Sequence, residues 1–435
     1  MRKLILAVIA LASAAVANSQ MPDEATRQYA SNYYAYPYTR MDVPALSAAP
    51  KGYEAFHIEH YGRHGSRWHI GKRAYNRPVE TLEIAERNGK LTPRGEELLG
   101  QLRELRDASI GRDGELSPLG ALQHRQIAQR MIKNFPTVFA GDAYVTARSS
   151  TVIRCILSMN NELHEFKAIN PRLRITSDAS AGDMKYIAND ETEGLDTLRQ
   201  SLMRKHAEKL SEKFKKAHPV GKEFIKKLIA DEKFVKDSIK VSSLFGYLFN
   251  IAANAQSLEM SQFPLHAPYD LFTADELRTH WQNNNVRWFL NYGNSALTGN
   301  TMMMGQRPLM RNIIASVDTA LTSPNVGANL RFGHEVILLP LAVLLELDDY
   351  GKEYNDLETL AEHWRNYEIY PMGSNIQLIF YRKKGDTTGK DVLVKALLNE
   401  RECRMPATPV EGCYYRWADL KKYYEDKMAK AEALH

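Results

Sequence analysis

Short runs of strand-forming residues occur near both ends of the chain, and helical spacing dominates between them. Ala55–Tyr61 (AFHIEHY) and Ala143–Thr146 are predicted strands in the N-terminal half. Further along, Asn329–Leu347 is typical of a strand, a turn and a helix. Asn375–Arg382 and Asp391–Leu397 flank a turn rich in Lys, Gly, Asp and Thr, which predicts a hairpin. Strands that alternate with helices at both ends of the chain indicate an α/β core.

Two helix starts share one short pattern. LTPRGEELL begins at Leu91 and LSPLGALQH begins at Leu116, and in each a Thr or a Ser precedes Pro. This is the pattern of an N-cap residue with Pro at the first helical position. Helices are therefore expected to begin at Pro93 and Pro118.

The middle of the chain is predicted to be helical. Five apolar residues recur at spacings of 4, 3, 4 and 3, on one face of a helix: Met203, Ala207, Leu210, Phe214 and Ala217. We expect a second helix to start at Pro219 and to continue through Leu228. The predicted fold is α/β, with a mixed-sheet core flanked by helices at residues 20–165 and 300–435. An all-α cap domain is predicted to be inserted at residues 166–299.

The first 19 residues differ from the rest of the chain. Arg2 and Lys3 precede an apolar run, Leu4–Ala17, that only Ser13 interrupts, and small residues follow up to Ser19. A basic start, a short apolar run and small residues at its end are typical of a secretory signal peptide. The run is short for a membrane span, and an N-terminal anchor helix is the alternative. The sequence therefore predicts a periplasmic or secreted protein without a stable membrane anchor.

The chain contains three cysteines in 435 residues, so that its fold does not depend on a disulfide framework. Cys403 and Cys413 lie ten residues apart in a Pro-containing stretch without a helix or strand pattern. In an oxidising compartment this pair is expected to form a disulfide, with two free thiols as the alternative. Cys155 lies in an apolar helical run and is expected to be buried.

Positive charge is concentrated in the predicted cap domain. The whole chain has a net charge of +5, while residues 204–240 alone contain 12 Lys and Arg against six Asp and Glu. A solvated helical face is the simpler interpretation, and a positive wall that attracts an anionic substrate is the functional one. Nucleic-acid binding is disfavoured, because the stretch has few aromatic residues that could stack on bases.

The residues with the clearest chemistry lie directly after the first predicted strand, in Arg63-His64-Gly65-Ser66-Arg67. Two guanidinium groups flank one imidazole, and such groups can hold the oxygens of a phosphate. The imidazole of His64 would then face phosphorus, which favours a nucleophilic role. The neighbouring positive charge is expected to keep this imidazole neutral, as attack requires. An anion-binding loop or a structural network is the alternative.

A metal site is a further alternative, because His57, His60, His64 and His69 lie close together in the sequence. His57 and His60 are three residues apart in a predicted strand and should point to opposite faces. Glu59 is the one carboxylate among them, and the adjacent arginines would repel a cation. No metal and no other cofactor is therefore predicted.

Four segments in order along the chain resemble the histidine phosphatase superfamily, in its acid phosphatase and phytase branch. They are Arg63–Arg67, Leu116–Gly120 with Gln123, Arg148-Ser149-Ser150 continuing to Arg154, and Phe332-Gly333-His334-Glu335. The run FGHEVILLPL at Phe332–Leu341 is most similar to the multiple inositol polyphosphate phosphatases. The resemblance implies a histidine phosphatase fold over nearly the whole chain that follows the signal peptide.

The resemblance also implies residue roles. His64 would be the nucleophile that forms a phosphohistidine, and Glu335 would be the general acid that protonates the leaving alkoxide. The phosphate would be held by the other basic residues of these motifs: Arg63, Arg67, Arg148 and His334. Several fixed donors suit a phosphoryl group in transfer, because its charge is spread over the equatorial oxygens.

Two positions depart from the family pattern. Trp68-His69 stands where many relatives have Pro two residues after the second arginine, so that the loop after Arg67 can follow a different course. Glu335 follows His334 directly, whereas the inositol phosphatases often have His-Ala-Glu and the acid phosphatases have His-Asp. The longer side chain of Glu335 changes the reach of the acid.

An inositol polyphosphate is the first substrate class that the resemblance implies. Its non-reacting phosphates need basic neighbours, for which Lys72 and the basic stretch at 204–240 are the candidates. A broad-specificity acid phosphatase or sugar phosphatase is the second interpretation. An exported anion-binding protein on a phosphatase-like scaffold, without turnover, is the third.

Overall fold

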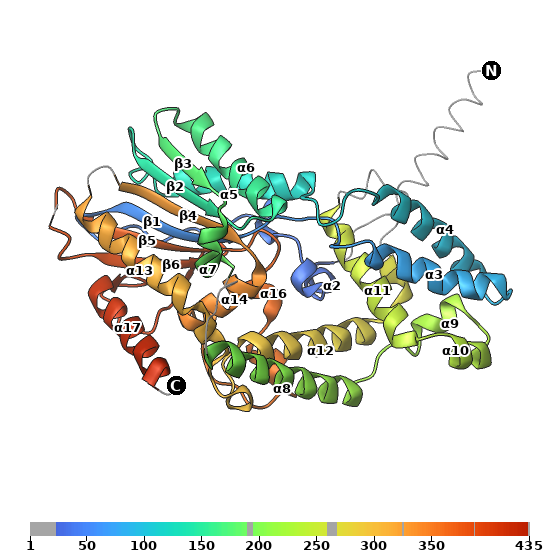
Figure 1. Ribbon diagram of the computed structural model, residues 1–435. Helices are drawn as coiled ribbons and strands as arrows, with labels where there is room; N and C mark the ends of the chain where they lie inside the picture. Colours follow the sequence, from blue (N-terminus) through green and yellow to red (C-terminus); the bar gives the residue numbers. More distant parts are fainter. Residues whose placement is uncertain (1–22, 189–194, 259–267, 324–325, 387, 434–435) are drawn as a thin grey trace, which may run out of the picture. The chain divides into compact units, whose positions relative to one another are not determined.

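A mixed β-sheet forms the centre of one of two units into which the chain divides (Figure 1). The computed structural model describes residues 23–188, 195–258, 268–323, 326–386 and 388–433. The sheet unit comprises Ala35–Arg67, Glu115–Pro219 and Trp281–His435. The helical unit comprises the described residues of Asp23–Tyr34, Trp68–Gly114 and Val220–His280. The predicted signal peptide, residues 1–19, lies outside the described residues.

Strands of the sheet follow the order β3-β2-β4-β1-β5-β6-β7, and β8 pairs with β6. Their bounds are β1 Tyr53–Arg63, β2 Tyr144–Ser149, β3 Arg174–Asp178, β4 Val326–Gly333, β5 Asn375–Lys383, β6 Leu393–Leu398, β7 Arg401–Cys403 and β8 Tyr415–Arg416. The strands β1 to β4 are parallel to one another. β5 pairs antiparallel with β1, β6 pairs antiparallel with β5, and β7 and β8 both pair antiparallel with β6. Because β1, β2 and β4 are parallel neighbours, their carboxyl ends meet at one edge of the sheet, where α/β proteins commonly bind ligands.

Helices cover both faces of this sheet (Figure 1). On one face, α5 (Pro118–Asn134) and α6 (Ile153–Ile169) bury an apolar cluster that includes Ile58 of β1 and Leu330 of β4. On the other face, α13, α14 and α17 pack against β-strand residues such as Phe380. Each fully buried side chain of this size stabilises the fold by about 1.5–3 kcal/mol. The other helices of the sheet unit have these bounds: α7 Met184–Ile187, α8 Leu195–Ala217, α13 Arg307–Thr322, α14 Glu335–Leu344, α15 Leu360–His363, α16 Asn366–Ile369 and α17 Trp417–Ala433.

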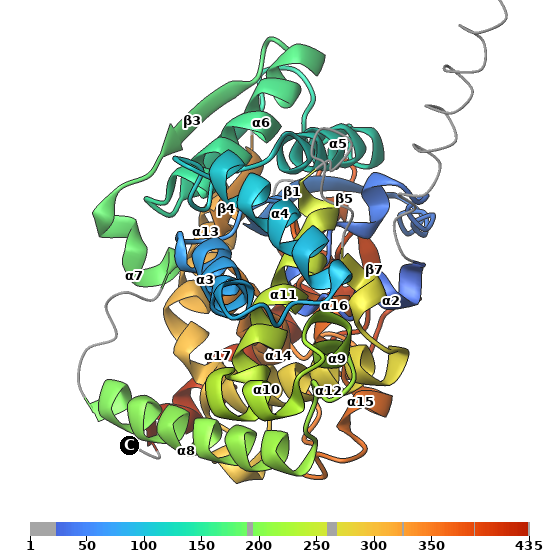
Figure 2. The ribbon, with the colours of Figure 1, turned by 90° about the vertical axis from the view of Figure 1, so that its right-hand side faces the viewer.

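The helical unit contains α2 Glu24–Gln28, α3 Arg73–Arg87, α4 Pro93–Ala108, α9 Phe224–Leu228, α10 Glu232–Ser238 and α11 Val241–Asn254. The helix α12 (Ala274–Tyr292) begins in this unit and ends in the sheet unit. Within the helical unit, α3 and α4 lie side by side and α11 packs against α3 (Figure 2). In the described part of the chain, none of the helices combines the length and the apolar character needed to span a membrane.

The local predictions agree well with the structure. β1, β2 and the strand-turn-helix from β4 into α14 are confirmed, and β5 and β6 form the expected antiparallel pair. Thr92 and Ser117 are N-cap residues whose hydroxyl oxygens accept hydrogen bonds from the N–H groups of Gly95 and Gly120. Cys155 is fully buried in α6, also as expected.

Two regional expectations differ from the structure. The helix predicted to start at Pro219 is α9, which begins only at Phe224 after a turn at Gly221 with a positive φ of 98°. A left-handed residue ends any helix that Pro219 could have started. The two units also have other boundaries than the predicted domains, because residues 68–114 group with residues 220–280, whereas α8 groups with the sheet.

The predicted Cys403–Cys413 disulfide is absent, and both residues are free thiols. Cys403 lies in β7, where it pairs with Ala396 of β6 and is buried. The Sγ atom of Cys413 lies 3.2 Å from Oγ of Ser47. Strand pairing directs Cys403 into the core, whereas Cys413 lies in a turn and contacts a different segment.

Candidate active site

The Arg63–Arg67 segment follows β1 at the edge where the parallel strands end, and the first turns of α5 support it. A Cβ atom at Gly65 would lie 2.5 Å from the carbonyl oxygen of Gly120, so that only glycine permits this contact. The side-chain oxygen of Gln123 accepts from the N–H of Ser66 over 2.9 Å, and its nitrogen donates to the Ser66 hydroxyl over 3.0 Å. These contacts bind the segment to α5, and the backbones of Gly65 and Gly120 approach each other closely.

His64 is buried, and its surroundings define its tautomer. The Nδ1 atom lies 2.9 Å from the carbonyl oxygen of Gly65. A carbonyl oxygen only accepts, so Nδ1 carries the proton and Nε2 keeps its lone pair. Nε2 in turn lies 3.8 Å from Oε2 of Glu335. The nucleophilic nitrogen is therefore directed toward the group predicted to be the acid.

Glu335 is the first residue of α14, and β4 ends two residues before it. Its Oε2 atom lies 3.0 Å from Nε of Arg63. Burial raises the pKa of Glu335, but the guanidinium groups of Arg63 and Arg67 outweigh it and lower the pKa to about 2. Without substrate, Glu335 is therefore an ionised carboxylate that lies beside the arginines.

His334, the N-cap residue of α14, lies next to His64, with the ring centroids 5.6 Å apart. Its Nε2 atom lies 3.3 Å from Oγ of Ser150 and 3.7 Å from Sγ of Cys155. The backbone N–H of His334 donates to the hydroxyl of Tyr61 over 3.3 Å. Burial lowers the pKa of His334 to about 4. Near neutral pH this residue is an uncharged hydrogen-bonding group that several contacts hold in place.

Arg148 was predicted to hold the phosphate, but its described contacts are not with His64, Arg63 or Glu335. It lies in β2, where its Nε atom is 3.4 Å from Oδ2 of Asp183 and its Nη1 donates to the carbonyl oxygen of Ala147. The third arginine is Arg154, in the first turn of α6, which acts electrostatically on His64. Its Nε atom is buried and has no hydrogen-bond partner in the part of the chain that the structure describes. The motif that begins at Arg148 extended to Arg154, and this was the signal in the sequence.

The site has an excess of positive charge. Burial and the guanidinium groups of Arg63, Arg154 and Arg67 hold the pKa of His64 well below its ordinary value of 6.5. Among the described residues of this site, Glu335 is the carboxylate that offsets these positive charges. Buried charges of one sign require an anion, and a phosphate provides two negative charges and several acceptor oxygens.

A metal ion has to be considered, because His64, His334 and Glu335 offer ligand atoms within 4.8 Å of one another. It is the one such cluster among the described residues. Both imidazoles are neutral, as metal ligands must be, but the Glu335 carboxylate is already paired with Arg63. Guanidinium groups at this distance repel a cation, so that the geometry fits an anion better than a metal.

The segment Tyr370–Ser374, which no sequence motif indicated, also holds Arg63–Arg67, the catalytic loop. The Nη1 atom of Arg63 donates to the carbonyl oxygen of Tyr370 over 2.6 Å, and its backbone N–H donates to that of Ser374 over 2.7 Å. The N–H of Gly373 donates to the carbonyl oxygen of His64 over 2.9 Å. The segment Tyr370–Ser374 lies close to Arg63 because β5, which follows this segment, pairs with β1.

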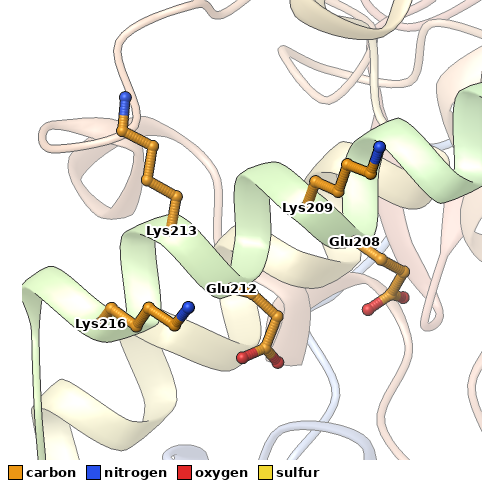
Figure 3. Close-up of a pocket in the computed structure, with 5 residues that line it drawn as sticks. All are labelled: Glu208, Lys209, Glu212, Lys213 and Lys216. Atoms are coloured by element: carbon orange, nitrogen blue, oxygen red, sulfur yellow. The ribbon is translucent and has the colours of Figure 1, made fainter.

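The other predicted basic residues are divided between the two units. Lys72 precedes α3 in the helical unit, and the basic stretch is divided into α8 of the sheet unit and α9 and α10 of the helical unit. On α8, a surface pocket of about 440 Å³ is lined by Glu208, Lys209, Glu212, Lys213 and Lys216. In Figure 3, Lys209 and Lys213 project from the opposite side of the helix to Glu208 and Glu212. Roles for Lys72 and for these lysines in substrate binding remain predictions.

Comparison with known proteins agrees with the motifs. No family model matches the chain. It is 25% identical over 349 residues to multiple inositol polyphosphate phosphatase 1 of Homo sapiens, across 74% of this chain and 67% of that protein. The multiple inositol polyphosphate phosphatase of Bifidobacterium longum, in its apo form, superposes with a TM-score of 0.76 at 20% identity, over 91% of this chain and 97% of that one. Its complex with inositol hexasulfate gives a TM-score of 0.75 at 19% identity and the same coverage.

The phytase from D. castellii has a TM-score of 0.66 at 14% identity, over 93% of this chain and 86% of that one. The described sheet with its flanking helices is thus a fold that these enzymes share. The identification from the four motifs is confirmed: this chain is related to the multiple inositol polyphosphate phosphatases and phytases, and it fits the histidine acid phosphatase branch.

Proposed function

We propose that the chain is an exported phosphomonoesterase that hydrolyses inositol polyphosphates through a phosphohistidine at His64. The observation that supports this most is the neutral His64 imidazole. Its Nε2 lone pair is directed into a site where Arg63, Arg67 and Arg154 outnumber the one carboxylate of Glu335. The buried Nε of Arg154 has no hydrogen-bond partner among the described residues, and an oxygen of a phosphate would accept from it.

In the first step, the three guanidinium groups and His334 hold the oxygens of the phosphate, and Nε2 of His64 attacks phosphorus. A nitrogen–phosphorus bond forms as the ester oxygen–phosphorus bond breaks. An inositol alkoxide leaves poorly, so Glu335 donates a proton to it. The bound phosphate neutralises the charge of Arg63 and Arg67, which lower the pKa of Glu335 in the free protein. The pKa of Glu335 therefore rises in the complex, and Glu335 takes up that proton from solvent.

In the second step, the Glu335 carboxylate accepts a proton from a water molecule, whose oxygen attacks phosphorus. The nitrogen–phosphorus bond breaks and returns its electron pair to His64, and inorganic phosphate leaves. The developing charge on the equatorial oxygens is stabilised throughout by the same arginines. The site needs no redox step.

The substrate class rests on the relatives, which are named for inositol polyphosphates and for phytate, and on the basic residues outside the catalytic loop. A broad-specificity acid phosphatase or sugar phosphatase remains the second candidate, because the catalytic residues contact only the reacting phosphate. Export rests on the sequence of residues 1–19 alone.

The test is phosphate release from a panel of inositol hexakisphosphate, its lower esters, a sugar phosphate and an aryl phosphate, with a chelator present. We expect the highest kcat/KM for the inositol polyphosphates and no effect of the chelator. Equal kcat/KM for all esters would favour the broad phosphatase. Phosphate binding without turnover of any ester would contradict an enzymatic function. Cleavage after residue 17 or 19 in an exporting host, read by N-terminal sequencing, would test the signal peptide.

A further inference from the structure

A tight turn between β6 and β7 lies close to the segment that holds Arg63 and His64. Its two central residues, Asn399 and Glu400, have positive φ values of 52° and 63°. Leu398 and Arg401 pair across it, so that this is a two-residue hairpin with both central residues left-handed. Asn is a common choice for such a turn, but Glu is not, and left-handed residues other than glycine cost conformational energy. Both residues are buried.

The side chain of Asn399 bonds to the backbone on both sides of the segment Tyr370–Ser374. Its Nδ2 atom donates to the carbonyl oxygens of Glu368 and Ile369 over 2.9 and 3.1 Å. Its Oδ1 atom accepts from the N–H of Asn375 over 3.1 Å, and its own N–H donates to the Asn375 carbonyl oxygen over 2.8 Å. One carboxamide therefore joins the two ends of the segment.

Inside these two ends, the segment makes its three contacts with the catalytic loop. The carbonyl oxygens of Tyr370 and Ser374 accept from Arg63, and the N–H of Gly373 donates to the backbone of His64. Since Arg63 is buried, the position of its guanidinium group depends on the Tyr370 carbonyl oxygen and on Glu335, while the Ser374 carbonyl oxygen holds its backbone.

Glu400 fixes the turn itself. Its carboxylate accepts two hydrogen bonds from Arg130 of α5, over 2.8 and 2.7 Å, and one from the hydroxyl of Tyr36 over 2.7 Å. The Tyr36 hydroxyl also accepts from Nδ2 of Asn375 over 3.2 Å. The left-handed turn is thus bonded to α5, which also supports the catalytic loop through Gln123.

We propose that Asn399 is a positioning residue for phosphate transfer: it fixes Tyr370–Ser374 and thereby the guanidinium group of Arg63. It does not touch the substrate. This inference rests on the proposed phosphatase function. If Asn399 served only the turn, glycine would replace it without loss, because glycine adopts the left-handed conformation most readily. A positioning role predicts the opposite for activity.

The experiment compares Asn399→Gly with Asn300→Gly. Asn300 also has a positive φ, 53°, and its side chain bonds to Glu353, so that the substitution is matched in conformation. We expect Asn399→Gly to lower kcat/KM roughly 10- to 100-fold, as for a catalytic group that is slightly misplaced. It should also raise the inhibition constant of inorganic phosphate, while Asn300→Gly changes neither.

Two further readouts separate positioning from loss of fold. The defect should be equal for inositol hexakisphosphate and an aryl phosphate, because Arg63 holds the phosphate and not the leaving group. It should also be several-fold smaller in an Arg63→Ala background, since residues that act as a unit are non-additive. All rates are measured at a temperature at which circular dichroism shows every variant folded. Asn399→Asp, which keeps the acceptor and loses both donors, replaces Asn399→Gly if the latter does not fold.

Unchanged kcat/KM in folded Asn399→Gly, or full additivity with Arg63→Ala, would overturn the positioning role. Those outcomes leave the proposed function intact, because the unmodified protein would still release phosphate. If the unmodified protein released phosphate from neither ester, the proposed function itself would fail.

Discussion

Two arginine–glutamate pairs involve the central strands of the same sheet, and they differ in how completely their polar atoms are satisfied. In the first pair, Nη1 of Arg331 lies 2.5 Å from Oε2 of Glu59, between β4 and β1. The other carboxylate oxygen accepts from His57, Ser316 and Asn329, and the remaining nitrogens of Arg331 donate to Asn312 and Ser316. In the second pair, one carboxylate, Glu335, lies beside Arg63 and acts on Arg154, whose Nε has no described partner.

A depressed pKa does not tell these pairs apart. The pKa of Glu59 is lowered to about 2, as is that of Glu335, and burial opposes the shift in both. The side chain of Glu335 is 12% exposed and that of Glu59 is 1% exposed. What distinguishes the site is the buried Nε of Arg154, which has no hydrogen-bond partner among the described residues. A matched buried pair has a structural role, and an unmatched one indicates a ligand.

The nucleophile of the unmatched site gives the largest expected effect. His64→Ala should lower turnover of every ester by 10⁴-fold or more, on the order seen when a nucleophile is removed, because no other group can form the covalent intermediate. The melting temperature should stay near that of the unmodified protein. A phosphoenzyme that is stable in base and labile in acid should be trapped only with His64 present. Substantial activity in the variant would rule out the covalent route.

Glu335→Gln should reduce hydrolysis of inositol phosphates by roughly 10²- to 10⁴-fold, the range for loss of a general acid. Aryl phosphates should be affected much less, because an aryl oxide leaves without a proton. The measurement is kcat for both substrates. An equal loss on both would assign the acid to another group, and the second pair would then resemble the first in having a structural role.

The choice of third arginine can be tested with two matched variants. Arg154→Gln should lower kcat/KM about 10²-fold, as removal of one transition-state donor does, while Arg148→Gln should have little effect. Loss of the Arg154 charge should also raise the pKa of His64 toward its ordinary value. The acid limb of the kcat/KM profile, where His64 becomes protonated, should therefore move to higher pH in Arg154→Gln only. A larger loss of kcat/KM in Arg148→Gln than in Arg154→Gln would show that Arg148 is the third arginine that binds the phosphate.

The matched pair should respond in stability and not in activity. Glu59→Gln leaves the buried Arg331 charge without its partner, and the free energy of unfolding should fall by about 3 kcal/mol. The folded pKa of Glu59, about 2, is below its ordinary value of 4.5. The carboxylate therefore stabilises the fold above that ordinary value, and this contribution is lost as the pH falls toward 2. Denaturant unfolding at several pH values measures both effects, with kcat as the control. A large loss of kcat in folded Glu59→Gln would contradict a purely structural role of the Glu59–Arg331 pair.

The smallest effect is expected from the exposed lysines. Replacing Lys209, Lys213 and Lys216 of α8 by Gln should raise KM for inositol hexakisphosphate a few-fold and leave KM for an aryl phosphate unchanged. The effect should shrink as salt rises, because charges are screened over about 10 Å at 0.1 M ionic strength. The same substitutions at Lys226, Lys227 and Lys233 test the other half of the basic stretch. If neither triple variant changed KM, the stretch would be a solvated surface.

The sequence by itself determined the features that depend on near neighbours. The strand before Arg63 and the helix starts at Pro93 and Pro118 followed from local spacing and capping, because these interactions span only a few residues. The segment Arg63–Arg67 was also visible, since both of its arginines lie within three residues of His64. Burial of Cys155 followed from the apolar run around it.

Only the tertiary structure decided which distant groups complete the site. Arg148 and Arg154 lie in one motif, but the end of β2 and the start of α6 direct them to different surroundings. Tyr370–Ser374 and Asn399 reach the loop because β5 pairs with β1 and β6 pairs with β5. Likewise, pairing of β7 with β6 placed Cys403 in the core as a free thiol. Strand order depends on burial summed over the whole unit, and no local pattern around these residues encodes it.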